Sequence, residues 1–241
     1  MATSLSVGRV VYKKGLAKED KISASQMYGA YGVFGSGNYT NTIDYITIST
    51  PGNATDFGDL TQGKGFLAAT SDGSRGVFGG GSFGTGGINP IDYITIATPG
   101  NATDFGDLTQ SRAQLSATSD GSRGVFGGGW LPGNANTIDY ITIATPGNAT
   151  DFGDLTQSRY NLAATSDGSR GVFGGGQNPG EVNTIDYIPI ATPGNATDFG
   201  DLTQARNTPA ATSDGSRGVF GGGAPPNLNT IDYITISRSE G

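Results

Sequence analysis

The sequence contains no cysteine and no histidine, and each absence removes a class of chemistry. Without cysteine there are no disulfides and no thiol nucleophiles, and without histidine there is no imidazole base. The two residues are also the usual protein ligands of zinc and copper. We therefore expect no metal site, no cofactor and no catalytic residues.

Long apolar runs are also missing. No run approaches the roughly 20 apolar residues that a membrane-spanning helix needs. The first residues, Met1–Gly8, lack the continuous apolar segment of a signal peptide. We therefore expect no membrane insertion and no secretion signal.

Positive charge is scarce relative to negative charge, and the formal net charge is −7. This balance argues against a nucleic-acid backbone as partner. The charge is uneven: residues 1–30 sum to +3 and the remainder to −10. The basic stretch Lys13–Lys21 is interpreted as a solvated patch, with a partner site as the alternative.

Glycine is abundant, with 42 residues, and it is accompanied by many Thr, Ser, Asn and Asp. This mixture favours short strands joined by tight turns and disfavours helices. Apolar residues make up only 34% of the chain, but they recur in regular clusters to its end. The composition predicts an all-β domain.

Internal repetition defines the architecture. The tripeptide Ile-Asp-Tyr begins at Ile43, Ile91, Ile138, Ile185 and Ile231, and Val-Phe-Gly begins at Val33, Val77, Val125, Val172 and Val219. The Ile-Asp-Tyr period of 46–48 residues fits one four-stranded propeller blade. Five copies predict a single closed five-bladed β-propeller that spans residues 1–241.

The third copy illustrates how each unit divides into strands. We expect strands over Leu115–Ser119, Arg123–Gly127, Thr137–Thr145 and Ala149–Gln157. Asp120-Gly121 is a strong hairpin signal, and Pro146-Gly147-Asn148 suits a tight turn. Apolar residues on both sides of the third strand predict a sheet covered by a neighbour on each face.

The N-terminal region does not follow the repeat closely. Ser6–Tyr12 has the pattern of a strand, and Ile22–Ser25 aligns with the small-residue first strands of the later copies. Residues 1–30 are therefore predicted to supply the outer strand of blade five and the inner strand of blade one. Such closure would remove the exposed sheet edges.

The Gly doublet after Val-Phe, followed by Tyr140 and then Phe152, resembles the kelch repeat over nearly the whole chain. Phe replaces the usual Trp, the interval from Tyr to the aromatic residue is long, and Ser36 interrupts the first doublet. Kelch-type and tachylectin-type propellers are mainly binding platforms, and these repeats are similar to repeats in bacteriophage virion proteins. The resemblance implies a lectin-like or structural binding protein of a virion or phage tail, extracellular when it functions.

The repeats vary in only two places. The interval from Ile-Asp-Tyr to the next Val-Phe-Gly is always 34 residues. The interval from Val-Phe-Gly to the next Ile-Asp-Tyr varies from 10 to 14 residues. All length changes thus lie between the second and third strands. The loops 63–66, 111–114, 158–161 and 205–208 vary in sequence as well. Because strands alternate in direction, both sets of loops are predicted at one end of the blades and the constant turns at the other.

Loops on a rigid scaffold often carry binding residues, so we predict a ligand-binding face at the variable end, with neutral drift as the alternative. Trp130, the only tryptophan, could stack on a sugar ring, anchor a protein contact or fold over its own blade. The candidate ligand-binding residues of this face are Tyr39, Phe83, Trp130, Asn178, Asn227, Lys64, Arg112, Arg159, Tyr160 and Arg206.

One aspartate recurs in every repeat, and this repetition predicts a structural role. We expect these residues to accept backbone hydrogen bonds or to pair with the arginines that follow the Asp-Gly turns. The aspartates are Asp44, Asp92, Asp139, Asp186 and Asp232, and the arginines are Arg75, Arg123, Arg170 and Arg217. Asp151 and Asp154 lack the dense run of oxygen ligands of a calcium loop.

The sequence supports three functions to different degrees. The first is a virion adhesin whose variable face binds a host glycan or a protein receptor. The second is a decoration or assembly module that docks onto another virion protein. The third, an enzyme, is disfavoured because the only glutamates are Glu19, Glu181 and Glu240, whereas five-bladed glycosidases need non-repeated carboxylates in the channel.

Overall fold

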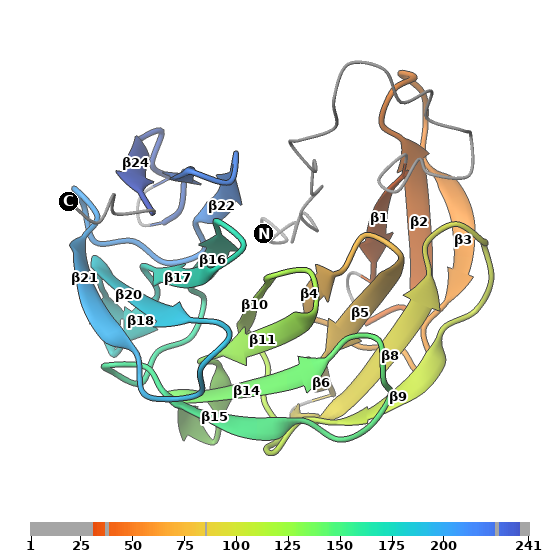
Figure 1. Cartoon of the computed structure of the whole chain (residues 1–241), viewed down its shortest axis with the longest axis horizontal. Helices are drawn as coiled ribbons and strands as arrows, with labels where there is room; N and C mark the ends of the chain where they lie inside the picture. Colours follow the sequence, from red (N-terminus) through yellow and green to blue (C-terminus); the bar gives the residue numbers. More distant parts are fainter. Residues whose placement is uncertain (1–30, 37–38, 85, 225–226, 237–241) are drawn as a thin grey trace.

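The computed structural model describes residues 31–36, 39–84, 86–224 and 227–236. These residues form strands and turns, and none of them lies in a helix. Figure 1 shows five sheets arranged around a common centre, each with its strands in sequential order. The predicted five-bladed β-propeller is confirmed.

Blades two, three and four are complete four-stranded antiparallel sheets. Blade two comprises β4 (Ala68–Ser71), β5 (Arg75–Gly79), β8 (Pro90–Thr95) and β9 (Thr103–Asp107). Blade three comprises β10 (Ser116–Ser119), β11 (Arg123–Gly127), β14 (Thr137–Thr142) and β15 (Thr150–Asp154). Blade four comprises β16 (Ala163–Ser166), β17 (Arg170–Gly174), β20 (Thr184–Pro189) and β21 (Thr197–Asp201). In Figure 1 the first strands lie nearest the centre and the fourth strands lie at the rim.

Blades one and five contribute three described strands each. Blade one comprises β1 (Tyr31–Gly35), β2 (Thr42–Thr47) and β3 (Thr55–Asp59), which are its second, third and fourth strands. Blade five comprises β22 (Ala210–Ser213), β23 (Arg217–Gly221) and β24 (Ile231–Thr235), which are its first three. The strands that residues 1–30 were predicted to supply lie outside the described residues.

The strands of blade three begin and end close to their predicted positions. The second strand matches, but the third ends at Thr142 instead of Thr145, because the Thr145 N–H donates to the Thr142 carbonyl and starts the turn. The fourth strand ends at Asp154 instead of Gln157, because the chain then leaves for the next blade. The predicted Asp-Gly hairpin is present, with the Asp120 carboxylate accepting the N–H groups of Ser122 and Arg123.

The hydrophobic core lies between successive sheets. Each of the four apolar clusters combines residues of two neighbouring blades. Phe173 of blade four, for example, packs onto Gly127 of blade three, where an added Cβ would lie 2.6 Å from the ring. Fully burying such a side chain stabilises the fold by roughly 1.5–3 kcal/mol. In blades one to four, the first glycine of the doublet thus provides the space that the next blade's phenylalanine occupies.

The described part of the chain offers no helix with the length and apolar character needed to cross a membrane.

Candidate ligand-binding face

The two variable sets of loops meet at one end of the propeller, as predicted. Between the second and third strands, blades two to four carry small hairpins: β6 (Ser82–Phe83) with β7 (Gly86–Gly87), β12 (Trp130–Leu131) with β13 (Gly133–Asn134), and β18 (Gln177–Asn178) with β19 (Gly180–Glu181). The loops 63–66, 111–114, 158–161 and 205–208, here called the inter-blade loops, pair with the loops between the second and third strands. The paired residues are Gly65 with Ser82, Ala113 with Trp130, Tyr160 with Gln177, and Asn207 with Ala224. We call this the variable end.

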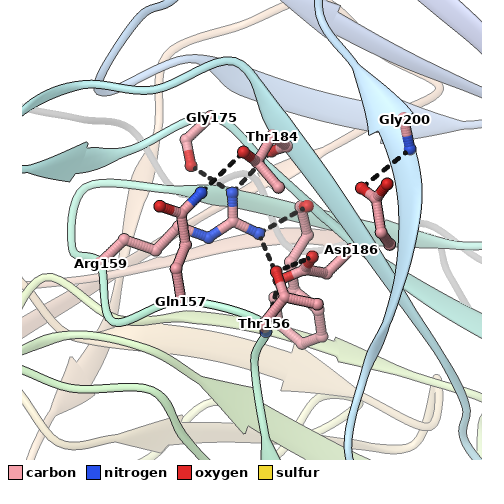
Figure 2. Close-up of polar contacts among 9 residues, drawn as sticks. Thr156, Gln157, Arg159, Gly175, Thr184, Asp186 and Gly200 are labelled. Atoms are coloured by element: carbon pink, nitrogen blue, oxygen red, sulfur yellow. Dashed lines mark hydrogen bonds and ion pairs between the residues drawn. The ribbon is translucent and has the colours of Figure 1, made fainter.

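The basic residues of the inter-blade loops do not lie on the surface. Lys64, Arg112, Arg159 and Arg206 are all fully buried. Their prediction as ligand-binding residues is therefore wrong. Figure 2 shows the reason for Arg159, whose guanidinium extends into the next blade and meets a carboxylate and several carbonyl oxygens.

Arg159 joins blade three to blade four through both its main chain and its side chain. The Arg159 N–H donates to the Ala135 carbonyl of blade three (3.0 Å). Its guanidinium donates to the carbonyls of Gly175 and Thr184 at 3.0 and 2.6 Å. It also lies 2.9 Å from the Asp186 carboxylate. The residue therefore links two blades through hydrogen bonds and an ion pair.

The aspartate of Ile-Asp-Tyr completes this arrangement. Asp186 also accepts hydrogen bonds from the Thr156 hydroxyl (2.6 Å) and the Thr156 N–H (3.1 Å), and Thr156 comes from the preceding blade. Equivalent pairs join the other described junctions: Arg112 with Asp139, Arg206 with Asp232, and Lys64 with Asp92. We call Lys64, Arg112, Arg159 and Arg206 the junction cations.

Burial governs the electrostatics of these pairs. Loss of water around Arg159 lowers the pKa of its guanidinium, and the neighbouring Asp186 carboxylate opposes that shift. Burial likewise lowers the pKa of Lys64, against the opposing effect of Asp92. A buried charge without a partner is costly, so each member of a pair is needed to compensate the other.

The structural role predicted for the repeated aspartates is confirmed for four of them, but the predicted arginine partners are wrong. Arg123 instead lies over the Tyr140 ring, with 4.6 Å from its Cζ to the ring centroid. It also donates to the Ile190 carbonyl of blade four at 3.0 Å. The other three arginines also lie over tyrosine rings: Arg75 over Tyr93, Arg170 over Tyr187, and Arg217 over Tyr233.

The opposite end, which we call the constant end, is also structurally constrained. The Asn148 side chain of the Pro-Gly-Asn turn accepts the Asp107 N–H of the preceding blade at 3.1 Å, and Asn195 accepts the Asp154 N–H in the same way. The constancy of this turn therefore follows from a contact between blades.

Exposed aromatic side chains gather at the variable end, around the start of blade two. Tyr39, Phe66 and Phe83 are 44, 48 and 62% exposed. The rings of Tyr39 and Phe66 meet edge to face, with centroids 6.2 Å apart. Phe83 follows Ser82, and Ser82 exchanges two backbone hydrogen bonds with Gly65, the neighbour of Phe66. We call these three residues the aromatic patch.

Phe66 was absent from the predicted site residues, although its loop was identified as variable. Its backbone has a φ of 56°, which is uncommon for a residue other than glycine. Its carbonyl accepts the Gln114 N–H of the next inter-blade loop at 2.8 Å. The scaffold thus fixes the Phe66 backbone while the ring stays exposed. The signal in the sequence was an aromatic residue where the other repeats carry Gln114, Asn161 and Thr208.

The remaining predicted residues also lie in the variable loops. Trp130, Tyr160 and Asn178 are partly buried, whereas Asn227 is exposed. Asn178 is engaged within the protein, because its side-chain oxygen accepts the Asn134 amide at 2.9 Å. These residues flank blades three to five, so the structure groups only Tyr39 and Phe83 of the predicted set into the aromatic patch.

Within the described ranges, no group of three or more His, Cys, Asp or Glu side chains is placed to hold a metal ion.

Comparison with protein-family models and with curated proteins finds no match to this chain. The likeness to kelch and phage repeats therefore rests on the repeat motifs alone.

Proposed function

We propose that this protein is a non-enzymatic binding protein whose variable end recognises a carbohydrate through the aromatic patch. The observation that supports the proposal is the position of the exposed aromatics. Tyr39, Phe66 and Phe83 are all exposed and all lie at the variable end.

Aromatic rings suit this role physically. A ring offers a large apolar face that can stack on a sugar, and neighbouring polar loops can bind the hydroxyls. Clustered exposed apolar side chains on a soluble surface often mark an interaction site. The buried junction cations support the proposal indirectly, because they hold the loops that carry the rings.

The similarity of the repeats to bacteriophage virion repeats suggests where the protein acts. We propose that it is a virion or phage-tail adhesin whose partner is a glycan or a protein receptor on the host. Weak single sites can give useful adhesion when several copies act together on one particle.

The test is binding of the labelled full-length protein to a broad glycan array. Phe66→Ala and Phe83→Ala should each weaken binding at least about tenfold, because central aromatic residues dominate many interfaces. Trp130→Ala should have a smaller effect. The matched control is Ile48→Ala, which removes an exposed apolar side chain (38%) near a constant-end turn and should leave binding unchanged.

The second candidate is a decoration or assembly module that docks onto another virion protein. The same exposed rings favour it, because aromatic residues are enriched at protein interfaces. No binding to any glycan, together with capture of a virion protein that Phe83→Ala abolishes, would establish this alternative. Equal glycan binding by all four variants would remove the aromatic patch from glycan recognition.

A further inference from the structure

Four residues of the inter-blade loops share an uncommon backbone conformation. Phe66, Gln114, Asn161 and Thr208 have φ values of 56, 57, 55 and 51°. Each lies two residues before the first strand of a blade (β4, β10, β16 or β22), and in Figure 1 these strands lie nearest the centre. The four residues therefore stand on the central side of the variable end, and we call them the central arc.

Backbone hydrogen bonds join the members of the central arc to one another. The Gln114 N–H donates to the Phe66 carbonyl at 2.8 Å, and the Asn161 N–H donates to the Gln114 carbonyl at 2.9 Å. The Thr208 N–H donates to the Asn161 carbonyl at 2.7 Å. Each of these bonds crosses from one inter-blade loop to the next. The backbone of the arc is thus the same at each junction, whereas the side chains that it carries differ.

Glycine is the residue that this backbone conformation favours, because a left-handed φ is sterically costly for the others. The chain uses glycine in this way at the constant end, where the Asp-Gly turns of blades two to five have φ values of 89–93° at glycine. Thr208 is β-branched, a side-chain type that is especially unfavourable at positive φ. Side chains at all four positions of the arc therefore indicate a function that outweighs their conformational cost.

Two members of the arc carry carboxamides that are free to bind a ligand. Gln114 and Asn161 are partly exposed, and neither side chain forms a hydrogen bond with another residue in the part of the chain that the structure describes. Other carboxamides of the variable end are engaged within the protein, as Asn207 is with Glu181 at 3.0 Å. A carboxamide both donates and accepts hydrogen bonds, which matches the hydroxyl groups of a sugar.

The central arc presents no charge. Its side chains are an aromatic ring, two carboxamides and a hydroxyl. Each member follows a junction cation by two positions, but that cation is fully buried and paired with an aspartate. The surface of the arc is therefore aromatic and polar but neutral, which favours hydroxyl groups over charged groups.

We propose that the central arc determines the specificity of the variable end and takes a neutral oligosaccharide, with one sugar stacked on Phe66 and the next hydrogen-bonded to Gln114 and Asn161. This site rests on the carbohydrate binding proposed above and names its ligand class. Hydrogen-bonded backbone segments lie about 4.8 Å apart, so Phe66 and Asn161 are separated by roughly 10 Å. A single sugar ring does not span that distance, so the ligand has at least two rings.

Glycine substitutions separate a binding role from a structural one. Gln114→Gly and Asn161→Gly remove the carboxamides and relieve the cost of the left-handed φ, so the Tm should stay the same or rise. Binding to neutral oligosaccharides should weaken about five- to tenfold for each variant. Ser111→Gly is the matched control, because Ser111 is exposed in the same loop as Gln114 and lacks a positive φ. It should lower the Tm slightly and leave binding unchanged.

The ligand class is tested on the full-length protein with three sets of probes: neutral oligosaccharides, their component monosaccharides, and sialylated or sulfated oligosaccharides. Tightest binding to the first set, with the expected losses in both glycine variants, supports the proposal. A lower Tm in the two glycine variants than in Ser111→Gly would assign these side chains a structural role instead. Tightest binding to monosaccharides or to charged oligosaccharides would refute the ligand class.

Phe66→Ala distinguishes failure of this site from failure of the proposed function. Loss of binding in Phe66→Ala, with unchanged binding in both glycine variants, would overturn the role of the central arc and leave carbohydrate binding intact. No binding of the wild-type protein to any of the three sets would overturn both.

Discussion

The junction between blades one and two differs from the junction between blades three and four in its buried cation. Lys64 reaches the Pro90 carbonyl at 3.2 Å and the Asp92 carboxylate at 3.0 Å. Arg159, in the same place, donates to three carbonyls and a carboxylate. Pro90 is the equivalent of Thr184, and its carbonyl is the one that Lys64 also binds. The carbonyls equivalent to those of Gly175 and Phe173 accept no bond from Lys64.

The difference follows from the shape of the two cations. A guanidinium is a planar fork with five N–H donors, whereas an ammonium is a compact charge with three. The junction with the less extensively bonded cation is also the one beside the aromatic patch. At this junction the chain therefore differs from the other repeats both in its buried cation and in its exposed aromatic residues.

The largest expected effect comes from removing a junction cation. Arg159→Met leaves Asp186 buried without its partner, and we expect the free energy of unfolding to fall by about 3–5 kcal/mol. Lys64→Met should cost less, because Lys64 makes fewer hydrogen bonds. Urea unfolding of the two variants measures the difference.

The control for this comparison is Arg159→Met combined with Asp186→Leu, which removes both charges and should recover much of the loss. An equal loss for Arg159→Met and Lys64→Met would mean that the two junctions are energetically alike despite their geometry.

A smaller effect is expected at the second glycine of the doublet. Gly80→Ser would place a Cβ 2.7 Å from the Arg112 carbonyl, at a φ of 64°, and should destabilise the protein by about 1–3 kcal/mol. Blade one already has Ser36 in this position, where its hydroxyl lies within hydrogen-bond distance of the Lys64 and Thr40 carbonyls. Ser36→Gly should therefore change the stability by no more than roughly 0.5 kcal/mol. Thermal unfolding of both variants provides the measurement, and the reverse order would contradict the account.

The smallest effect is expected from Lys64→Arg, which restores the repeat consensus. The guanidinium should gain carbonyl bonds and stabilise the protein by about 1 kcal/mol at neutral pH.

This gain should depend on pH. Burial holds the folded-state pKa of Lys64 below 10.5, so the unfolded chain binds that proton more tightly. The wild-type stability therefore rises with pH between the lowered folded-state pKa and 10.5. The arginine stays charged over this range, so its advantage should shrink as the pH approaches 10. An advantage that grows with pH would show that the Lys64 pKa is raised instead.

The sequence was sufficient to predict the blades, because their signals are local and repeated. Asp-Gly and Pro-Gly-Asn specify turns, and the constant interval after Ile-Asp-Tyr separates fixed turns from variable loops. The strand ends were less accurate, since Thr145 and Gln157 continue an extended pattern past the point where the chain turns.

The junction cations were predicted as residues of the exposed ligand-binding face, because they lie in variable loops and nothing local in the sequence shows that they are buried. Arg112, Arg159 and Arg206 recur at one position, as Asp139, Asp186 and Asp232 do, and they are their partners. The two members of a pair lie 26 or 27 residues apart in the sequence. The fold of the inter-blade loop against the third strand of the following blade brings them together.

The most direct test measures stability and glycan binding on the same two variants, Arg159→Met and Phe66→Ala. Binding of the strongest glycan from the array is titrated at a temperature below both unfolding transitions. The account predicts that Phe66→Ala keeps the wild-type Tm and loses binding, whereas Arg159→Met loses stability and keeps binding. Loss of binding in folded Arg159→Met, with unchanged binding in Phe66→Ala, would contradict the division between buried junction cations and an exposed aromatic patch.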